Sequence, residues 1–333
     1  MSQLTIGDRA QSLILSRRNE TLKDSIQSLS HESVTGLIRD TTERVKGDFV
    51  PLAGIEATLT QLDAYRSVTA ETGMIANHMQ LALTSIADSA ATLGSSLLAA
   101  ASSNSPSRIN TLGLDSTQRL NGAMAALNAR MGDRSLFAGV ATDSSAVAPP
   151  ETMMIALDAA VSGAISSADV EDAVNAWFTD PAGFEAVVYQ GGTPLGPVPI
   201  GPDQQAQLDV TAVDPAIVSM IKGLAMASLL QRGVLAGSDV ARADLAKRAG
   251  ESLASSQTAF AELGARLGTT EAGIVNAGVQ NDAQKAALET ARLGLLSVDP
   301  YETAAKLQEA QTQLETLFAI TARMSRLSLV NFL

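Results

Sequence analysis

The side chains that could carry out catalysis are few and scattered. Ser219 and Lys222 have the S-x-x-K spacing of serine acyl-transfer enzymes, in which a lysine one helical turn away helps to activate the serine. The strings S-D-N and K-T-G that accompany this motif in such enzymes do not occur in the sequence. Short motifs of this kind often match by chance. A helix with a solvated lysine therefore explains the spacing better than a catalytic site does.

Few residues could bind a metal or act as a nucleophile. The chain has no cysteine and only two histidines, His31 and His78, neither of which has a second histidine three or four residues away. Asp169, Glu171 and Asp172 form a tight carboxylate group, but the ligand order and central glycine of an EF-hand are missing. Acidic residues favour the first turn of a helix, so this group indicates a helix start. We expect no enzyme activity, no cofactor and no metal.

A stretch rich in glycine and proline, residues 191–202, is a turn rather than a phosphate-binding loop. It does not open a helix, and its prolines lack the amide N–H groups that a phosphate cradle requires. The apolar runs on either side predict a β-hairpin with strands at 184–189 and 198–200. A short additional strand is expected at 208–210. Helices are expected near 153–165 and 168–177.

Charge divides the chain into three parts. Of 333 residues, 35 are acidic and 23 basic, which gives a net charge of −12. No lysine or arginine occurs between Ser135 and Ile221, although eleven acidic residues and eight of the eleven prolines fall there. The flanks are nearly neutral and poor in proline. The composition therefore predicts an acidic middle domain inserted between two helical flanks.

The charge and hydropathy also exclude some partners. Proteins that bind duplex nucleic acid need clustered lysine and arginine, so we expect no nucleic acid. Apolar runs end in a polar residue after fewer than ten residues, whereas a bilayer span needs about 20. The first residues also lack the basic and apolar blocks of a Sec-type signal peptide. We therefore expect no membrane association and no cleaved signal.

The two chain ends have the periodicity of coiled-coil helices. Leu15, Leu22 and Leu29 recur every seven residues. At the other end, Asp299-Pro300 is a helix start signal, and Leu307 and Leu314 open a second heptad pattern. Between the ends we expect helices that end near 102–107, run from about 115 to 131, start near 238, and run from 271 to 296. The fold class is therefore mainly α, a rod of long helices in a coiled coil or bundle with a smaller α/β or β-containing domain inserted in the middle.

The C-terminal sequence resembles that of the bacterial flagellin family. Residues 307–333 are a glutamine-rich amphipathic segment that ends in T-A-R-M-S-R-L-S-L-V-N-F-L, and the lead-in D-P-Y-E-T-A precedes it. L-F-A-G-V-A-T-D at 136–143 resembles a string typical of the hook–filament junction members of that superfamily, the hook-associated protein 3 type. Residues 21–36 resemble the family's first helix. The pattern then departs, since only Asp40 remains of a usual aspartate pair.

The resemblance implies a structural subunit of the flagellum that joins hook to filament, with flagellin itself as the alternative. Such proteins pack their terminal helices as a coiled coil, project a variable domain and leave the cell through the flagellar type III route without a cleaved signal. The implied partners are further copies in a ring, a neighbouring hook-associated protein, flagellin, and an export chaperone on the C-terminal helix. A coiled-coil sensor or adaptor is a weaker alternative, because a membrane span and signal peptide are not found.

These expectations define five segments and one interface. The segments are an N-terminal assembly helix (1–45), a helical rod (46–139), an acidic outer domain (140–221), a second rod segment (222–297) and a C-terminal assembly helix (298–333). The candidate assembly interface consists of apolar residues on the terminal helices: Leu13, Leu22, Ile26, Leu29, Leu307, Leu314, Leu317, Phe318, Met324 and Leu327.

Overall fold

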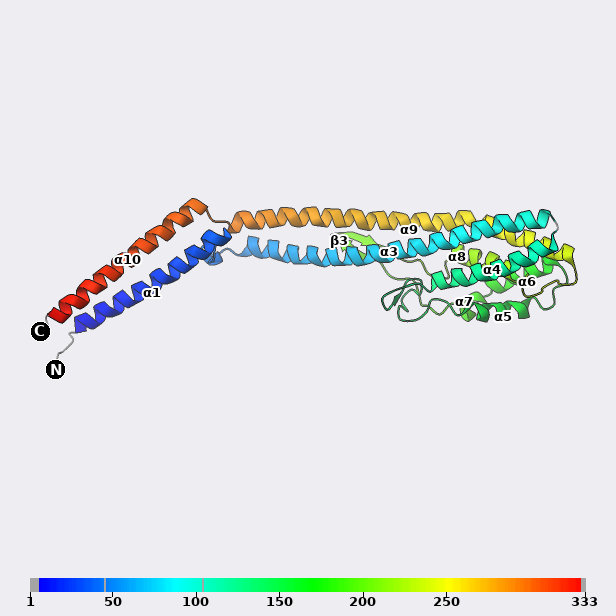
Figure 1. Cartoon of the computed structure of the whole chain (residues 1–333), viewed down its shortest axis with the longest axis horizontal. Coiled ribbons are helices and arrows are strands. Elements are labelled where there is room, and N and C mark those ends of the chain that lie inside the picture. Colours follow the sequence, from blue (N-terminus) through cyan, green and yellow to red (C-terminus); the bar gives the residue numbers. More distant parts are fainter. Residues whose placement is uncertain (1–5, 45, 104, 331–333) are drawn as a thin grey trace. The chain divides into compact units, whose positions relative to one another are not determined.

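The fold is mainly α, as predicted. The structure, a computed structural model, describes residues 6–44, 46–103 and 105–330, with backbone only at 6–9, 43 and 325–330. Helices hold 73% of the chain. The helices are α1 (Ile6–Thr35), α2 (Thr41–Arg44), α3 (Val50–Ser102), α4 (Pro106–Leu127), α5 (Pro150–Ala160), α6 (Ser167–Thr179), α7 (Phe184–Val187), α8 (Pro215–Ser228), α9 (Asp239–Leu296) and α10 (Pro300–Val330) (Figure 1). The strands are β1 (Arg130–Met131), β2 (Arg134–Ser135), β3 (Val198–Gly201) and β4 (Gln204–Ala206).

The chain divides into two compact units. The terminal unit contains the described residues up to Leu62 and those from Ala283 onward. The central unit runs from Asp63 to Asp282. The main hydrophobic core, which extends in sequence from Ile75 to Ala277, lies wholly within the central unit.

Helices α3 and α9 lie side by side in the central unit (Figure 1). Their backbones approach closely, because a Cβ atom built on Gly250 would lie 3.0 Å from the carbonyl oxygen of Gly94. The sequence pattern predicts two helices after residue 238, but α9 is one continuous helix. That prediction is wrong because Gly268 merely weakens a helix, while buried Leu267 and Ile274 continue the apolar stripe across it.

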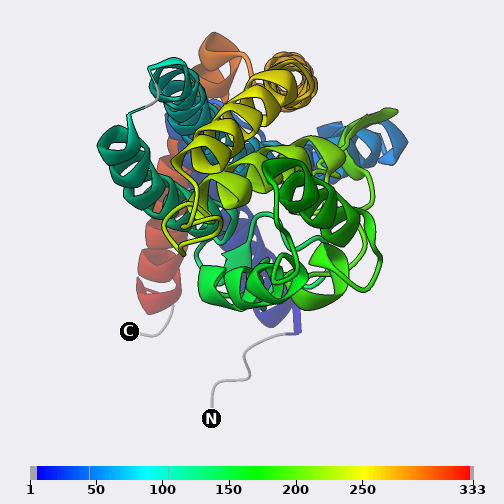
Figure 2. The same cartoon turned by 90° about the vertical axis from the view of Figure 1, so that its right-hand side faces the viewer.

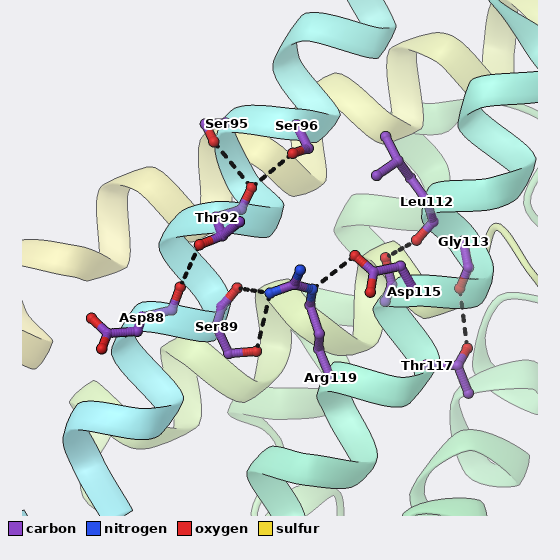
Figure 3. Close-up of polar contacts among 11 residues, drawn as sticks. Asp88, Ser89, Thr92, Ser95, Ser96, Leu112, Gly113, Asp115, Thr117 and Arg119 are labelled. Carbon is purple, nitrogen blue, oxygen red and sulfur yellow. Dashed lines mark hydrogen bonds and ion pairs between the residues drawn. The ribbon is translucent and has the colours of Figure 1, made fainter. Parts of the chain in front are cut away.

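Helices α4, α5, α6 and α8 complete the central unit (Figure 2). Arg119 joins α4 to α3. Its Nε donates to Asp115 Oδ2 at 2.8 Å, and its Nη1 donates to the Ser89 carbonyl oxygen at 2.9 Å (Figure 3). The side chain thus satisfies a carboxylate on its own helix and a backbone acceptor on the neighbouring one.

The helices of the acidic segment are confirmed. The group at Asp169 starts α6 through a capping box, in which Ser166 and Asp169 bond each other's backbone N–H. The segment's carboxylates pair with arginines that follow it in sequence. Arg232 binds Glu151 and Asp158, Arg248 binds Glu171, and Arg266 binds Asp214.

The predicted strand at 184–189 is wrong, since residues Phe184–Val187 form the short helix α7. Phe184 stacks on Phe178 with ring centroids 5.3 Å apart, and Trp177 packs edge-on against both rings. This aromatic cluster replaces the expected strand pairing. The strand at 198–200 is confirmed as part of β3, but its partner is β4. The expected strand at 208–210 does not form, because the chain turns earlier, at Asp203, which has a φ of 56°.

One described helix, α3, is long and apolar enough to cross a bilayer by length and composition alone. Core helices of globular proteins pass the same test. Met79, Ile86 and Leu93 on this helix are at most 1% exposed, and all three belong to the hydrophobic core. Packing inside the central unit thus accounts for the hydrophobicity of α3.

Candidate assembly surface on the terminal helices

The residues singled out for possible chemistry occupy structural positions. Ser219 and Lys222 lie on α8, whose residues Ile217, Met220 and Leu224 are fully buried in the core. Within the described residues, no hydrogen bond joins the serine to the lysine. No group of three or more histidine, cysteine, aspartate or glutamate side chains that could hold a metal occurs among the described residues. The structure thus places the S-x-x-K pair on a helix of the hydrophobic core.

The string at 136–143 forms a buried crossing of two chain segments. Phe137 and Ala138 are fully buried. Gly139 has a φ of +59°, and a Cβ atom there would lie 2.3 Å from the Thr193 carbonyl oxygen. The Val140 N–H donates to that same oxygen at 2.9 Å, and the Gly192 N–H donates to the Ala138 carbonyl oxygen at 2.9 Å. A glycine is required here by both backbone conformation and space.

The glycine- and proline-rich stretch finds its role in the same crossing. Gly191 and Gly192 lie against the backbone of residues 138–141, and the Tyr189 hydroxyl donates to the Gly192 carbonyl oxygen at 2.6 Å. Residues 191–197 are therefore a packed loop that leads into β3, and not the turn of the predicted hairpin.

Helices α1 and α10 form an antiparallel pair in the terminal unit (Figure 1). The amide of Gln11 lies 3.9 Å from the sulfur of Met324, while at the opposite end Leu37 and Ser297 form an antiparallel bridge. The more buried residues of α10 recur at spacings of four and three, and once of seven, the pattern of a coiled-coil seam: Thr303, Leu307, Ala310, Leu314, Leu317 and Met324. This seam follows the periodicity seen in the sequence.

The matching face of α1 follows the same rule. Its partly buried residues include Leu15, Asn19, Leu22, Ile26 and Leu29, again four and three residues apart. Asn19 is the polar exception, and its Oδ1 is buried without a hydrogen-bond partner among the described residues. A single polar residue in such a seam favours one register over others, at a cost in stability.

Backbone hydrogen bonds join the segment that follows α1 to the last residue of α9 and to the segment between α9 and α10. The Ile38 N–H donates to the Leu296 carbonyl oxygen at 2.9 Å, and the Val298 N–H donates to that of Gly36 at 3.0 Å. Asp299 then caps α10, since its Oδ1 accepts from the Tyr301 N–H at 2.8 Å. This confirms Asp299-Pro300 as the start signal. These bonds hold the end of α1 next to the start of α10.

The structure divides the ten predicted interface residues into two groups. Most contribute to the α1–α10 pair inside one chain: Leu317 is buried, while Leu22, Ile26, Leu29, Leu307, Leu314 and Met324 are half-buried. Leu13 and Phe318 are instead exposed, by 55% and 48%. Leu327 lies on α10, but its side chain is outside the described ones. Whether any of them contacts another subunit stays a prediction.

Other exposed apolar residues of the terminal helices do not appear among the ten. Of these, Ile14 and Ile320 lie within two residues of Leu13 and Phe318 in the sequence. Neither residue lies on the seven-residue repeat of Leu15, Leu22 and Leu29 or on that of Leu307 and Leu314. The sequence pattern that could have indicated them is an apolar residue at a helix position that lies outside a two-helix seam.

The comparisons with known proteins identify one end of the chain. Residues 252–333 match the family of the bacterial flagellin C-terminal helical region. No curated protein matches the sequence. A structure from Vibrio parahaemolyticus, provisionally described as a flagellar hook-associated protein, is 12% identical, with a TM-score of 0.48 over 72% of this chain and 94% of that one. The family match confirms the flagellin resemblance of the C-terminal sequence, and it includes all of α10.

Proposed function

We propose that this chain is a structural, non-catalytic subunit of the bacterial flagellum that joins the hook to the filament. The observation that carries the proposal is the flagellin-type C-terminal region, which ends in a helix already paired with the N-terminal helix. The proposed location is the hook–filament junction, which the chain reaches by the flagellar type III export route without a cleaved signal.

Exposed apolar residues support assembly through the terminal helices. Leu13, Ile14, Phe318 and Ile320 remain exposed although the pair has formed. Burying a side chain of this size stabilises a complex by about 1.5–3 kcal/mol. These residues together with the seam make up the proposed assembly surface, and Leu327 is included because it widens the apolar stripe of the C-terminal helix in the sequence.

The proposed partners follow from this role. They are further copies of the chain in a ring, a neighbouring hook-associated protein, flagellin, and an export chaperone that holds the C-terminal helix. We also propose that segments 1–45 and 298–333 are the inner assembly helices, that 46–139 and 222–297 form the rod, and that 140–221 is the outer domain.

A flagellin, the filament subunit itself, is the second candidate, because the matched family is named for flagellin. The string at 136–143 favours the junction role, since its sequence resembles one typical of junction proteins.

Electron microscopy of cells that lack the gene separates the two. A junction protein predicts finished hooks, no filaments and flagellin shed into the medium. A filament subunit predicts hooks without filaments and no shed flagellin. Normal filaments in cells with no second copy of the gene would overturn both.

A further inference from the structure

A groove lies on α1 beside its seam with α10. It encloses about 550 Å³, and its lining residues are Lys23, Ile26, Gln27, Ser30, His31, Val34 and Thr35 of α1 with Leu314 of α10. Val34 is 85% exposed although it is apolar. The lining contains no acidic residue, so an apolar segment that carries a negative charge would complement it.

Charge selects one occupant among the four exposed residues of the proposed assembly surface, Leu13, Ile14, Phe318 and Ile320. On a helix, residues three or four apart share a face. Leu13 and Ile14 share theirs with Arg17 and Arg18, and Ile320 shares its face with Arg323. Such cations would be repelled by Lys23.

Phe318 differs from these three residues. It shares its face with Glu315, and within the described residues neither Glu315 nor Lys23 makes an ion pair. Phe318 therefore supplies an apolar side chain to fill the groove, and Glu315 supplies the negative charge that the lining of the groove lacks.

We propose that Phe318 of a second copy of this chain docks in this groove beside Val34, with Glu315 of that copy against Lys23. This inference rests on the proposed function, because it identifies a specific contact through which copies assemble. The groove lies on α1 and the inserted side chain on α10, so each copy both offers a groove and supplies an occupant.

Cysteine cross-linking tests the contact directly, because the chain has no cysteine of its own. A full-length chain with Ser30→Cys in the groove is mixed with one carrying Ala322→Cys, which lies on the face of Phe318. A short bismaleimide should give a 30–322 link between copies as the main product, identified by peptide mass spectrometry. Thr316→Cys, on the opposite side of α10, is the matched control and should give little product.

Association measurements test the two components of the contact. By light scattering, Phe318→Ala should raise the concentration for half-association about tenfold or more, since it removes most of the buried ring. Tyr301→Ala, which removes an exposed ring from the same helix, should leave that concentration unchanged. Lys23→Glu should weaken association up to about fivefold. Mixing Lys23→Glu with Glu315→Lys should restore it at that contact.

The two levels of the proposal fail in different ways. Oligomers that form normally in the Phe318→Ala chain, or that link equally through Thr316→Cys, would overturn the groove contact and leave assembly standing. A wild-type chain that stays monomeric at every concentration reached would overturn both.

Discussion

At the scale of single residues, Gly139 is constrained by both backbone conformation and space. A side chain there meets the Thr193 carbonyl oxygen and also has to adopt a left-handed backbone. The left-handed conformation costs a non-glycine residue about 1–2 kcal/mol, and overpacking typically costs about 1–3 kcal/mol. The requirement explains why the F-A-G string carries a glycine.

We therefore expect Gly139→Ala to lower the free energy of unfolding by about 2–4 kcal/mol. Urea unfolding followed by the fluorescence of Trp177, the only tryptophan, measures this directly. Gly122→Ala is the control, because that glycine lies on helix α4 with nothing within 4 Å of the added atom. It should be neutral or slightly stabilising. Equal stability of the Gly139→Ala and wild-type chains would contradict the crossing described above.

Leu314 is a residue of the seam at which a charge should be damaging. It is half-buried against α1, so Leu314→Asp places a carboxylate where apolar side chains meet. We expect this variant to lose helicity by circular dichroism and to fail to assemble, at a cost of about 2–4 kcal/mol to the pair.

Ala319→Asp, on the exposed side of the same helix, provides the comparison for helicity. It should retain the α1–α10 pair in the isolated chain. If Leu314→Asp retained full helicity and also formed oligomers, the seam would have no part in assembly.

At the scale of elements, the acidic segment is tied to the rest of the central unit by ion pairs that depend on pH. Hydrogen bonds from Arg232 lower the pKa of Glu151. The Ser167 hydroxyl, and after it Arg248, lowers the pKa of Asp244. A carboxyl group with a lowered folded pKa stabilises the fold above its unfolded pKa, and that stabilisation is lost as the pH falls through the folded pKa.

Acid should therefore loosen the acidic segment first. The stabilising contribution of these carboxylates is complete near neutral pH. It begins to fall as the pH drops below the ordinary pKa values, 4.5 for Glu151 and 3.8 for Asp244, and it is lost below their lowered pKa values in the folded chain. A pH titration of Trp177 fluorescence measures the change. Arg232→Met should make the transition shallower, whereas Arg66→Met, which removes an exposed ion pair elsewhere, should not. A transition with the same midpoint and slope in all three chains would exclude these ion pairs as its cause.

The elements also show which features a sequence can predict. Heptad spacing and the Asp299-Pro300 signal predicted α10 correctly, because its apolar residues contact one long neighbour throughout. Residues 184–189 have an equally apolar sequence, yet they form α7. The rings of Trp177 and Phe178, six to seven residues earlier, pack against Phe184, and a strand pattern does not anticipate this ring packing. The pairing of Arg232 with Glu151 is a long-range contact that no local pattern indicates.

The same limit applies to the candidate assembly surface. The seven-residue repeat located the seam on both terminal helices. It could not separate Leu314, which faces α1, from Phe318, which is exposed, because the two are one turn apart and both apolar. That distinction depends on the orientation of the pair, which only the structure provides.

At the scale of the whole molecule, stability is unevenly distributed between the two units. All residues of the main core cluster belong to the central unit. In the terminal unit, few of the side chains that the structure describes are buried. Leu52, Leu62 and Leu317 are among these few. Long helices with a narrow apolar seam are only marginally stable without further packing. The terminal pair should therefore unfold well before the central unit, and assembly should stabilise it.

A fragment of residues 63–282 should consequently fold alone. We expect it to keep the Trp177 fluorescence and the main unfolding midpoint of the full chain, because it contains every residue of the main hydrophobic core. Hydrogen exchange of the full-length monomer should show weak protection in α1 and α10 and strong protection in buried parts of α3 and α9. In assembled material, protection should rise in α1 and α10, since the neighbouring copies cover them. An unfolded fragment, or terminal helices as strongly protected in the monomer as α9, would mean that the terminal pair contributes to the core and does not depend on assembly for its stability.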